Sequence, residues 1–376
     1  MTTLNVSTTS QLLAAMRSSQ GGDTILLAPG SYSGVALWAV NKASPVTIQS
    51  ADPNNPAVIN SLTLAISSGF TFNDLNFNAN GSAASQTAPA GTDQFNILSS
   101  QNITLDNINV YGDSPAAGGA LATAQSGIYF KTDANVTLEN SSFQYLMNAV
   151  TENFDNNITI SNNSFQYLYN DGIDGGGDSN VTIIANTFDS LNIDPTNALH
   201  ADAIQFWTAN TSASAKNITI DGNTFTRGSG GIAHGIYLYD ESGGRLPYQN
   251  VEISNNSVSG AGWDGISVYS ADNVQITNNT VTSYADQLSW MTVQNANGVT
   301  FDGNSASEFV FTPNDTNLEQ SNNTIIPAVP IPVAGVAQLV SAMATFAPAS
   351  AGWTAAGSDA SQGQVLPSLV APRAVA

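Results

Sequence analysis

Residues 157–166 read Asn-Ile-Thr-Ile-Ser-Asn-Asn-Ser-Phe-Gln, and versions of this phrase recur along the chain. The phrase restarts at Asn102, Asn135, Asn157, Asn180, Asn217, Asn250, Asn273 and Gly298. Each copy alternates apolar with polar residues, which indicates a strand with one buried and one exposed face. Repeats of roughly 22 residues are too short for helical crossovers, so parallel strands must stack coil on coil. The sequence therefore predicts an all-β fold, a right-handed parallel β-helix (solenoid) with three short strands per coil.

The two ends of the chain depart from the repeat. Residues 10–17, Ser-Gln-Leu-Leu-Ala-Ala-Met-Arg, carry apolar residues at helical spacing and predict a capping helix, because the ends of a solenoid expose unpaired strand edges. After Pro327 the repeat stops and the sequence becomes rich in Pro and Ala. We expect an N-terminal cap over residues 1–23, the β-helix over 24–326, and a C-terminal cap or tail over 327–376.

The composition limits the possible partners. A hydrophobic content of 42% over 376 residues is enough to bury a sizeable core. The net charge of −21 opposes the phosphate backbone, so we expect no nucleic-acid partner. The longest apolar stretch, residues 325–339, is interrupted by three prolines, so we expect no membrane span. The chain has no cysteine and no cleavable signal peptide at its N-terminus, which favours secretion by a signal-peptide-independent route, although a cytosolic protein fits the same facts.

Aligned strands bring polar side chains into columns with a spacing of about 4.8 Å. Two residues before the buried Ile or Val, one column holds Ser126, Asn148, Asp171, Asp202, His234 and Asp264. Two outward columns hold Tyr129, Thr151, Asp174, Gln205, Tyr237 and Ser267, and Lys131, Asn153, Gly176, Trp207, Tyr239 and Tyr269. Both histidines of the chain, His200 and His234, fall in this carboxylate patch, which favours function over a purely structural role.

We predict two sets of site residues from these columns. The catalytic set is Asp171, Asp174, His200, Asp202 and His234, and the substrate-binding set is Lys131, Gln205, Trp207, Tyr237, Tyr239, Arg245 and Tyr269. The alternative is that an Asp before Gly at a solenoid corner is an ordinary turn residue. Extra chain length at Gly112–Ser126, Asp189–Ala198, Thr208–Lys216 and Asp240–Gln249 predicts loops that wall one groove beside these columns.

Two stretches resemble known β-helix enzymes. Gly22-Asp23, Pro29-Gly30-Ser31-Tyr32 and Pro45-Val46-Thr47-Ile48 resemble the start of the alginate lyase and chondroitinase B family, which implies a shared N-terminal cap. Asn170-Asp171-Gly172 and Ala233-His234-Gly235 resemble the Asn-x-Asp-Gly and Gly-His-Gly strands of polygalacturonases, with Asp202 where the second Asp of their Asp-Asp pair lies. The first Asp of that pair, the proton donor, is Ala201 here, and their Arg-Ile-Lys is missing. The resemblances imply a pectin-lyase-like, carbohydrate-active fold with a polysaccharide substrate.

Three functions fit these residues. The first is a glycoside hydrolase in which crowded Asp carboxylates serve as acid and base without a required cofactor. The second is a polysaccharide lyase or uronate C5-epimerase in which Asp171, Asp174 and Asp202 hold Ca²⁺. Its candidate bases are Lys131, His200, His234, Tyr237 and Arg245. Mannuronan epimerases resemble the chain at Asp174, but their following Pro-His-Glu is Gly175-Gly176-Gly177 here. The third is a non-catalytic surface solenoid that binds glycans or copies of itself. The sequence leaves the oligomeric state open.

Overall fold

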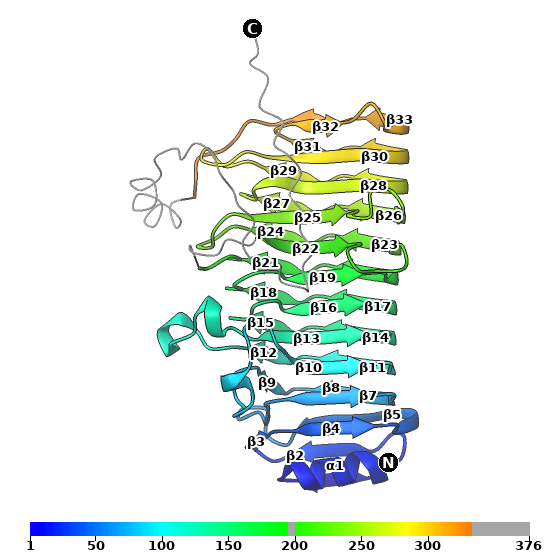
Figure 1. Ribbon diagram of the computed structural model, residues 1–376. Helices are drawn as coiled ribbons and strands as arrows, with labels where there is room; N and C mark the ends of the chain where they lie inside the picture. Colours follow the sequence, from blue (N-terminus) through cyan, green and yellow to red (C-terminus); the bar gives the residue numbers. More distant parts are fainter. Residues whose placement is uncertain (195–199, 333–376) are drawn as a thin grey trace.

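The computed structural model describes residues 1–194 and 200–332, and these form a right-handed parallel β-helix (Figure 1). Helix α1 (Thr9–Ser18) lies across the N-terminal end of the solenoid. Its N-cap, Thr8, accepts a hydrogen bond from the backbone N–H of Gln11, and its Leu12 and Met16 are fully buried. The helix therefore shields the first coil as predicted. Within the described ranges no helix is long and apolar enough to span a membrane.

Each coil contains three strands. The first strands are β4 (Val35–Trp38), β7 (Leu62–Ala65), β10 (Asp93–Leu98), β13 (Ser126–Lys131), β16 (Val150–Asn153), β19 (Ile173–Gly176), β22 (Ala201–Trp207), β25 (Ala233–Tyr239) and β32 (Phe309–Phe311). The second strands are β1 (Thr3–Val6), β2 (Thr24–Leu27), β5 (Asn41–Ser50), β8 (Ser68–Asn73), β11 (Gln101–Asp106), β14 (Ala134–Glu139), β17 (Asn156–Ser161), β20 (Ser179–Ile184), β23 (Lys216–Asp221), β26 (Tyr248–Ser254) and β33 (Thr316–Ser321). Strands β28 (Trp263–Thr277) and β30 (Ser289–Asp302) run through both positions and join the two rows into one sheet.

The third strands form a separate parallel sheet along the other side of the coils. They are β3 (Ser31–Tyr32), β6 (Val58–Ile59), β9 (Asn76–Asn78), β12 (Asn109–Tyr111), β15 (Ser142–Gln144), β18 (Ser164–Gln166), β21 (Thr187–Asp189), β24 (Thr224–Thr226), β27 (Ser257–Ser259), β29 (Thr280–Thr282), β31 (Ser305–Ala306) and β34 (Thr324–Ile325). Short 3₁₀ turns η1 (Ser85–Thr87), η2 (Pro115–Ala117) and η3 (Leu121–Thr123) lie in the loops before β10 and β13.

The core is built from columns of identical positions. The predicted apolar column is confirmed, because its members are buried and paired in register from coil to coil: Ile128, Val150, Ile173, Ile204, Ile236 and Ile266. Opposite this column, the rings of Phe143, Phe165 and Phe188 stack with centroid separations of 4.9 and 4.8 Å.

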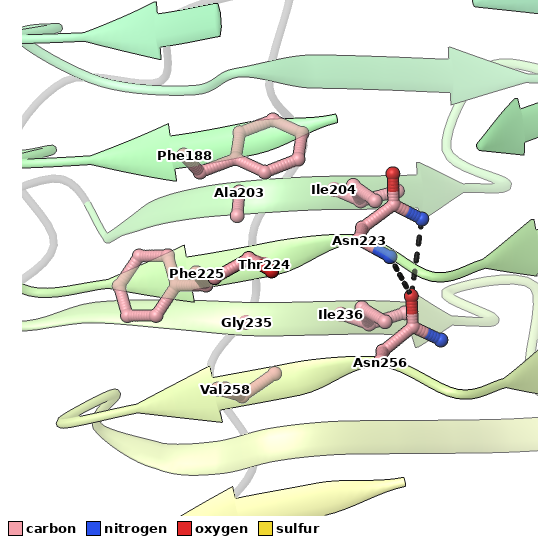
Figure 2. Close-up of a pocket in the computed structure, with 10 residues that line it drawn as sticks. All are labelled: Phe188, Ala203, Ile204, Asn223, Thr224, Phe225, Gly235, Ile236, Asn256 and Val258. Atoms are coloured by element: carbon pink, nitrogen blue, oxygen red, sulfur yellow. Dashed lines mark hydrogen bonds between the residues drawn. The ribbon is translucent and has the colours of Figure 1, made fainter. Parts of the chain in front are cut away.

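Buried asparagines close the corner between the second and third strands of successive coils (Figure 2). The side chain of Asn223 donates to the carbonyl of Ile183 at 2.9 Å and to Oδ1 of Asn256 at 3.0 Å. The same Oδ1 accepts the backbone N–H of Asn223 at 2.8 Å. Each Asn side-chain oxygen therefore accepts hydrogen bonds from N–H groups of the coil before it. This ladder continues through Asn163, Asn186, Asn279 and Asn304. This buried Asn, which stands near the end of each phrase as Asn163 does, therefore satisfies buried polar groups, which accounts for its place in the repeat.

The insertions do not lie on one flank, contrary to the expectation. Gly112–Ser126 and Asp189–Ala198 fall between a third strand and the next first strand, whereas Thr208–Lys216 and Asp240–Gln249 fall between a first and a second strand. The two pairs therefore leave from opposite ends of the first strands, because they interrupt different corners of the coil. Residues 195–198 of the second insertion and residues 333–376 of the expected C-terminal tail lie outside the described residues.

Candidate active site

The candidate site is centred on one carboxylate shared by two histidines. Asp202, near the start of β22, has Oδ2 2.8 Å from Nδ1 of His200 and Oδ1 2.9 Å from Nδ1 of His234 on the next coil. Burial favours a raised pKa for Asp202, but the charges and hydrogen bonds of the two imidazoles outweigh it and hold the pKa at about 2. Asp202 is therefore ionised at neutral pH and fixes the orientation of both rings.

The carboxylate of Asp171, on the preceding coil, holds the backbone of Asp202 in place. The backbone N–H of Asp202 donates to Oδ1 of Asp171 at 2.8 Å, and Asn170 donates its side-chain amide to Oδ2 of Asp171 at 2.8 Å. Asp171 and Asp202 are both completely buried, although we expected them to face solvent at the corner. The reason lies in strand alternation: a residue two positions before a buried Ile points to the same side as that Ile.

Asp174 is also buried, with only 3% of its surface exposed. Its Oδ2 accepts hydrogen bonds from Asn148 at 3.1 Å and Thr151 at 3.2 Å, while Oδ1 has no partner among the described residues. Burial and then the charge of Asp171 raise its pKa well above the usual value. The protonated form of Asp174 is therefore favoured more than in an exposed Asp.

The titratable groups beside Asp202 are two imidazoles and a phenol. The side chains of His200 and His234 are 22% and 11% exposed, and their ring centroids lie 5.0 Å apart. The ring of Tyr237 lies 5.8 Å from His200 and 5.2 Å from His234. Burial and then the charge of Asp264 raise the pKa of Tyr237 far above its usual range, so its hydroxyl stays protonated. The arrangement offers two imidazoles to accept or donate protons and one phenol to donate them.

The predicted binding aromatics gather beside this group. Tyr237 and Tyr239 stack at 5.8 Å, and Tyr269 packs edge-on against both, at 5.8 and 5.2 Å. Trp207 lies over Gly176, where a Cβ atom would come within 2.8 Å of the indole. That close approach explains one of the three consecutive glycines that stand where the epimerase resemblance has Pro-His-Glu.

Other predicted binding residues are not part of this group. Gln205 lies on β22 between the site and Trp207, but it is 96% buried, with 4% of its surface exposed. Lys131 ends β13, three coils before β22, with its Nζ 5.9 Å from the ring centroid of Tyr129. Arg245 lies in the loop after β25, at the opposite end of the first strands from the histidines, and its Nε donates to the carbonyl of Ser242. Lys131 and Arg245 therefore do not lie beside the imidazoles.

Two residues next to the site were not in the predicted set. Trp263, the first residue of β28, is 52% exposed, and its ring lies 6.5 Å from that of His234. Asp264 accepts hydrogen bonds from Ser267 at 2.5 Å and Tyr269 at 3.3 Å. Asp264 stands in the first column of the sequence alignment, but an Asp before Gly is typical of an ordinary turn, so it was left out of the predicted set. Trp263 was detectable only from its place one coil after His234.

The ligand atoms of the site suit some cations better than others. Nitrogen and oxygen ligand atoms of His200, Asp202 and His234 all lie within 4.8 Å of one another, which suits a transition-metal ion better than Ca²⁺. Ca²⁺ needs six to eight oxygen ligands, whereas the oxygens of Asp171 and Asp202 already accept hydrogen bonds from N–H groups. These carboxylates are therefore not arranged as a calcium cage, and calcium dependence stays a prediction.

Comparisons with known proteins agree with the architecture. The sequence matches the family model described as "Right handed beta helix region" over residues 67–250 and 234–328. The structure is similar to the A-module of the mannuronan C-5 epimerase AlgE4 from Azotobacter vinelandii, with a TM-score of 0.56 and 13% identity over 86% of this chain and 95% of that one. It is also similar to a DFA-IIIase variant from Arthrobacter chlorophenolicus (TM-score 0.52, 9% identity, 86% and 95% covered). A surface protein and adhesin of Streptococcus pneumoniae, PfbA, scores 0.50 at 14% identity, with 85% and 93% covered. No curated protein matches by sequence.

Proposed function

We propose that this chain, which belongs to the right-handed β-helix family, binds a polysaccharide and alters it by proton transfer through His200 and His234. The observation that carries the proposal is the buried, ionised Asp202 between the two Nδ1 atoms. A carboxylate in that position fixes the ring orientation and stabilises the imidazolium, while the Nε2 side of each ring turns away from it. The solenoid thus holds two oriented proton carriers at the edge of an aromatic surface.

Among the three reactions, proton abstraction from a uronate ring fits this geometry best. An imidazole takes the C5 proton; Tyr237 then gives its proton to the leaving oxygen as the C4–O bond breaks, which is elimination, or a proton returns to the other face of C5, which is epimerisation. Hydrolysis by two carboxylates needs both to face the scissile bond, but Asp171 and Asp202 are completely buried. The likeness to a protein named as a mannuronan C-5 epimerase supports the same choice, although the shared fold alone does not decide it.

The test is a panel of alginate, polygalacturonate, xylan and inulin with three product assays. We expect unsaturated uronate, detected by ultraviolet absorbance, or epimerised uronate, detected by NMR, from an acidic polymer, and a loss of at least about 100-fold in the His234→Ala variant. Glu319→Gln, at an exposed site on β33, is the control and should keep full activity. Reducing ends without unsaturation would establish the hydrolase instead. Binding without any product would establish the non-catalytic solenoid.

A further inference from the structure

Trp263 is a large aromatic residue that is exposed to solvent, although its exposure does not stabilise the fold. It is the first residue of β28, and 52% of its surface is open to solvent, whereas Ile266 and Val268 on the same strand are completely buried. Large aromatic side chains contribute most when buried, and exposed ones concentrate at binding sites. Its ring lies 6.5 Å from the His234 ring, at an angle of 64°.

Two more apolar side chains surround Trp263 on neighbouring coils. Ile232, just before β25, is 41% exposed, and Leu288, just before β30, is 53% exposed. Trp263 pairs in register with Ser289, which follows Leu288, and the backbone N–H of Gly262 bonds to the carbonyl of Ala233, which follows Ile232. The three side chains therefore leave the same corner of three successive coils.

We infer that Trp263, flanked by Ile232 and Leu288, binds the apolar face of a sugar ring and holds the polysaccharide against the imidazoles. The inference rests on the proposed function and names a subsite for it. Binding sites for such ligands combine an aromatic wall with a few fixed polar groups. Asp264, the next residue, supplies the polar group: hydrogen bonds from Ser267 and Tyr269 fix its carboxylate, which is an acceptor for sugar hydroxyls.

Because Trp263 contacts no reacting atom, it is a positioning residue, and binding is the direct measurement of its role. The parent for the test is the full chain carrying Asp202→Asn, which leaves polymers intact during titration. Affinity electrophoresis with alginate, polygalacturonate, xylan and inulin identifies the polymer that the parent retains. We expect Trp263→Ala to weaken retention of that polymer by at least about 10-fold, because an aromatic anchor in a site is lost.

Trp38→Ala is the matched control, since Trp38 on β4 is 56% exposed and lies far along the solenoid from the histidines. It should bind as the parent does. Equal retention by Trp263→Ala and the parent would overturn the subsite, and so would retention of no polymer by either. A wild-type chain that binds through Trp263 but makes no product would overturn the proposed reaction and leave the subsite standing.

Discussion

A buried glutamate provides a quantitative test of the interior. Glu152 on β16 points inward, paired in register between Phe130 and Gly175. It is completely buried, and neither carboxylate oxygen has a hydrogen-bond partner among the described residues. Burial, and then the charges of Asp178, Asp155 and Asp174, raise the pKa of Glu152 well above its ordinary value of 4.5. The folded protein therefore keeps a proton that the unfolded chain loses near pH 4.5.

The size of the effect follows from proton linkage. Wherever the folded state binds one proton more than the unfolded state, the free energy of unfolding falls by about 1.4 kcal/mol per pH unit. With an unfolded pKa near 4.5, this loss accumulates between pH 5 and 7 for as long as Glu152 keeps its proton in the fold, to at most about 3 kcal/mol. Gln at this position cannot titrate. The free energy of unfolding of Glu152→Gln, relative to that of the wild type, should therefore rise between pH 5 and 7, by up to about 3 kcal/mol.

Guanidinium denaturation at pH 5, 6 and 7 measures this difference from the midpoints. Asp133, Asp155 and Asp178 also have raised pKa values, about 7, 8 and 7, so both proteins lose further stability over this range. That loss is common to the two and cancels in the comparison. Glu319→Gln, the same change at an exposed site, should follow the wild-type profile. Parallel profiles for Glu152→Gln and the wild type would refute the reasoning, because Glu152 would then be ionised in the fold.

Three further changes test other parts of the structure. Asp202→Asn should lower turnover by about 10²–10⁴-fold in steady-state kinetics, because the amide cannot accept hydrogen bonds from both imidazoles; unchanged turnover would remove the site. Asn223→Ala should cost about 2–4 kcal/mol in denaturation, because it leaves the carbonyl of Ile183 and the amide of Asn186 unpaired; a cost below about 1 kcal/mol would contradict the ladder. Gly175→Ala should cost about 1–3 kcal/mol by the same assay, because its Cβ would lie 2.6 Å from the ring of Phe206, and a neutral effect would show that the ring moves freely.

The fold was predictable because every coil repeats the same information. The alternation in Asn157-Ile-Thr-Ile recurs in each second strand, and a one-residue slip in any copy would expose its apolar residues. The position of each loop was harder to predict, since the extra length of a coil does not say which of its three corners the insertion interrupts. The repeat spacings predicted an insertion at Asp240–Gln249. They did not predict that it leaves the first strands at the end opposite to Asp189–Ala198.

The site was only partly predictable. The spacing of Asp202 and His234 brought them to adjacent coils, and the structure joins them by a hydrogen bond. Strand alternation accounts for the burial of Asp171 and Asp202, but the burial of Asp174 was not predictable, because its hydrogen-bond partners come from another coil. Asp174 sits at an outward position, yet Asn148 and Thr151 from the preceding coil enclose it. The exposure of Trp263 likewise depends on the side chains of the coils before and after its own.

Asp174 and Asp202 show how the pKa of one residue type shifts in opposite directions in one site. Both are almost completely buried, so burial favours the neutral form of each. Two imidazoles face Asp202 and lower its pKa to about 2, whereas burial and the charge of Asp171 raise the pKa of Asp174 and outweigh its hydrogen bonds from Asn148 and Thr151, which lower it. Only Asp202 therefore places a fixed negative charge against the imidazoles. Both histidines of the chain lie against that one carboxylate, which is why we place the proposed proton transfer at the start of β22 and β25.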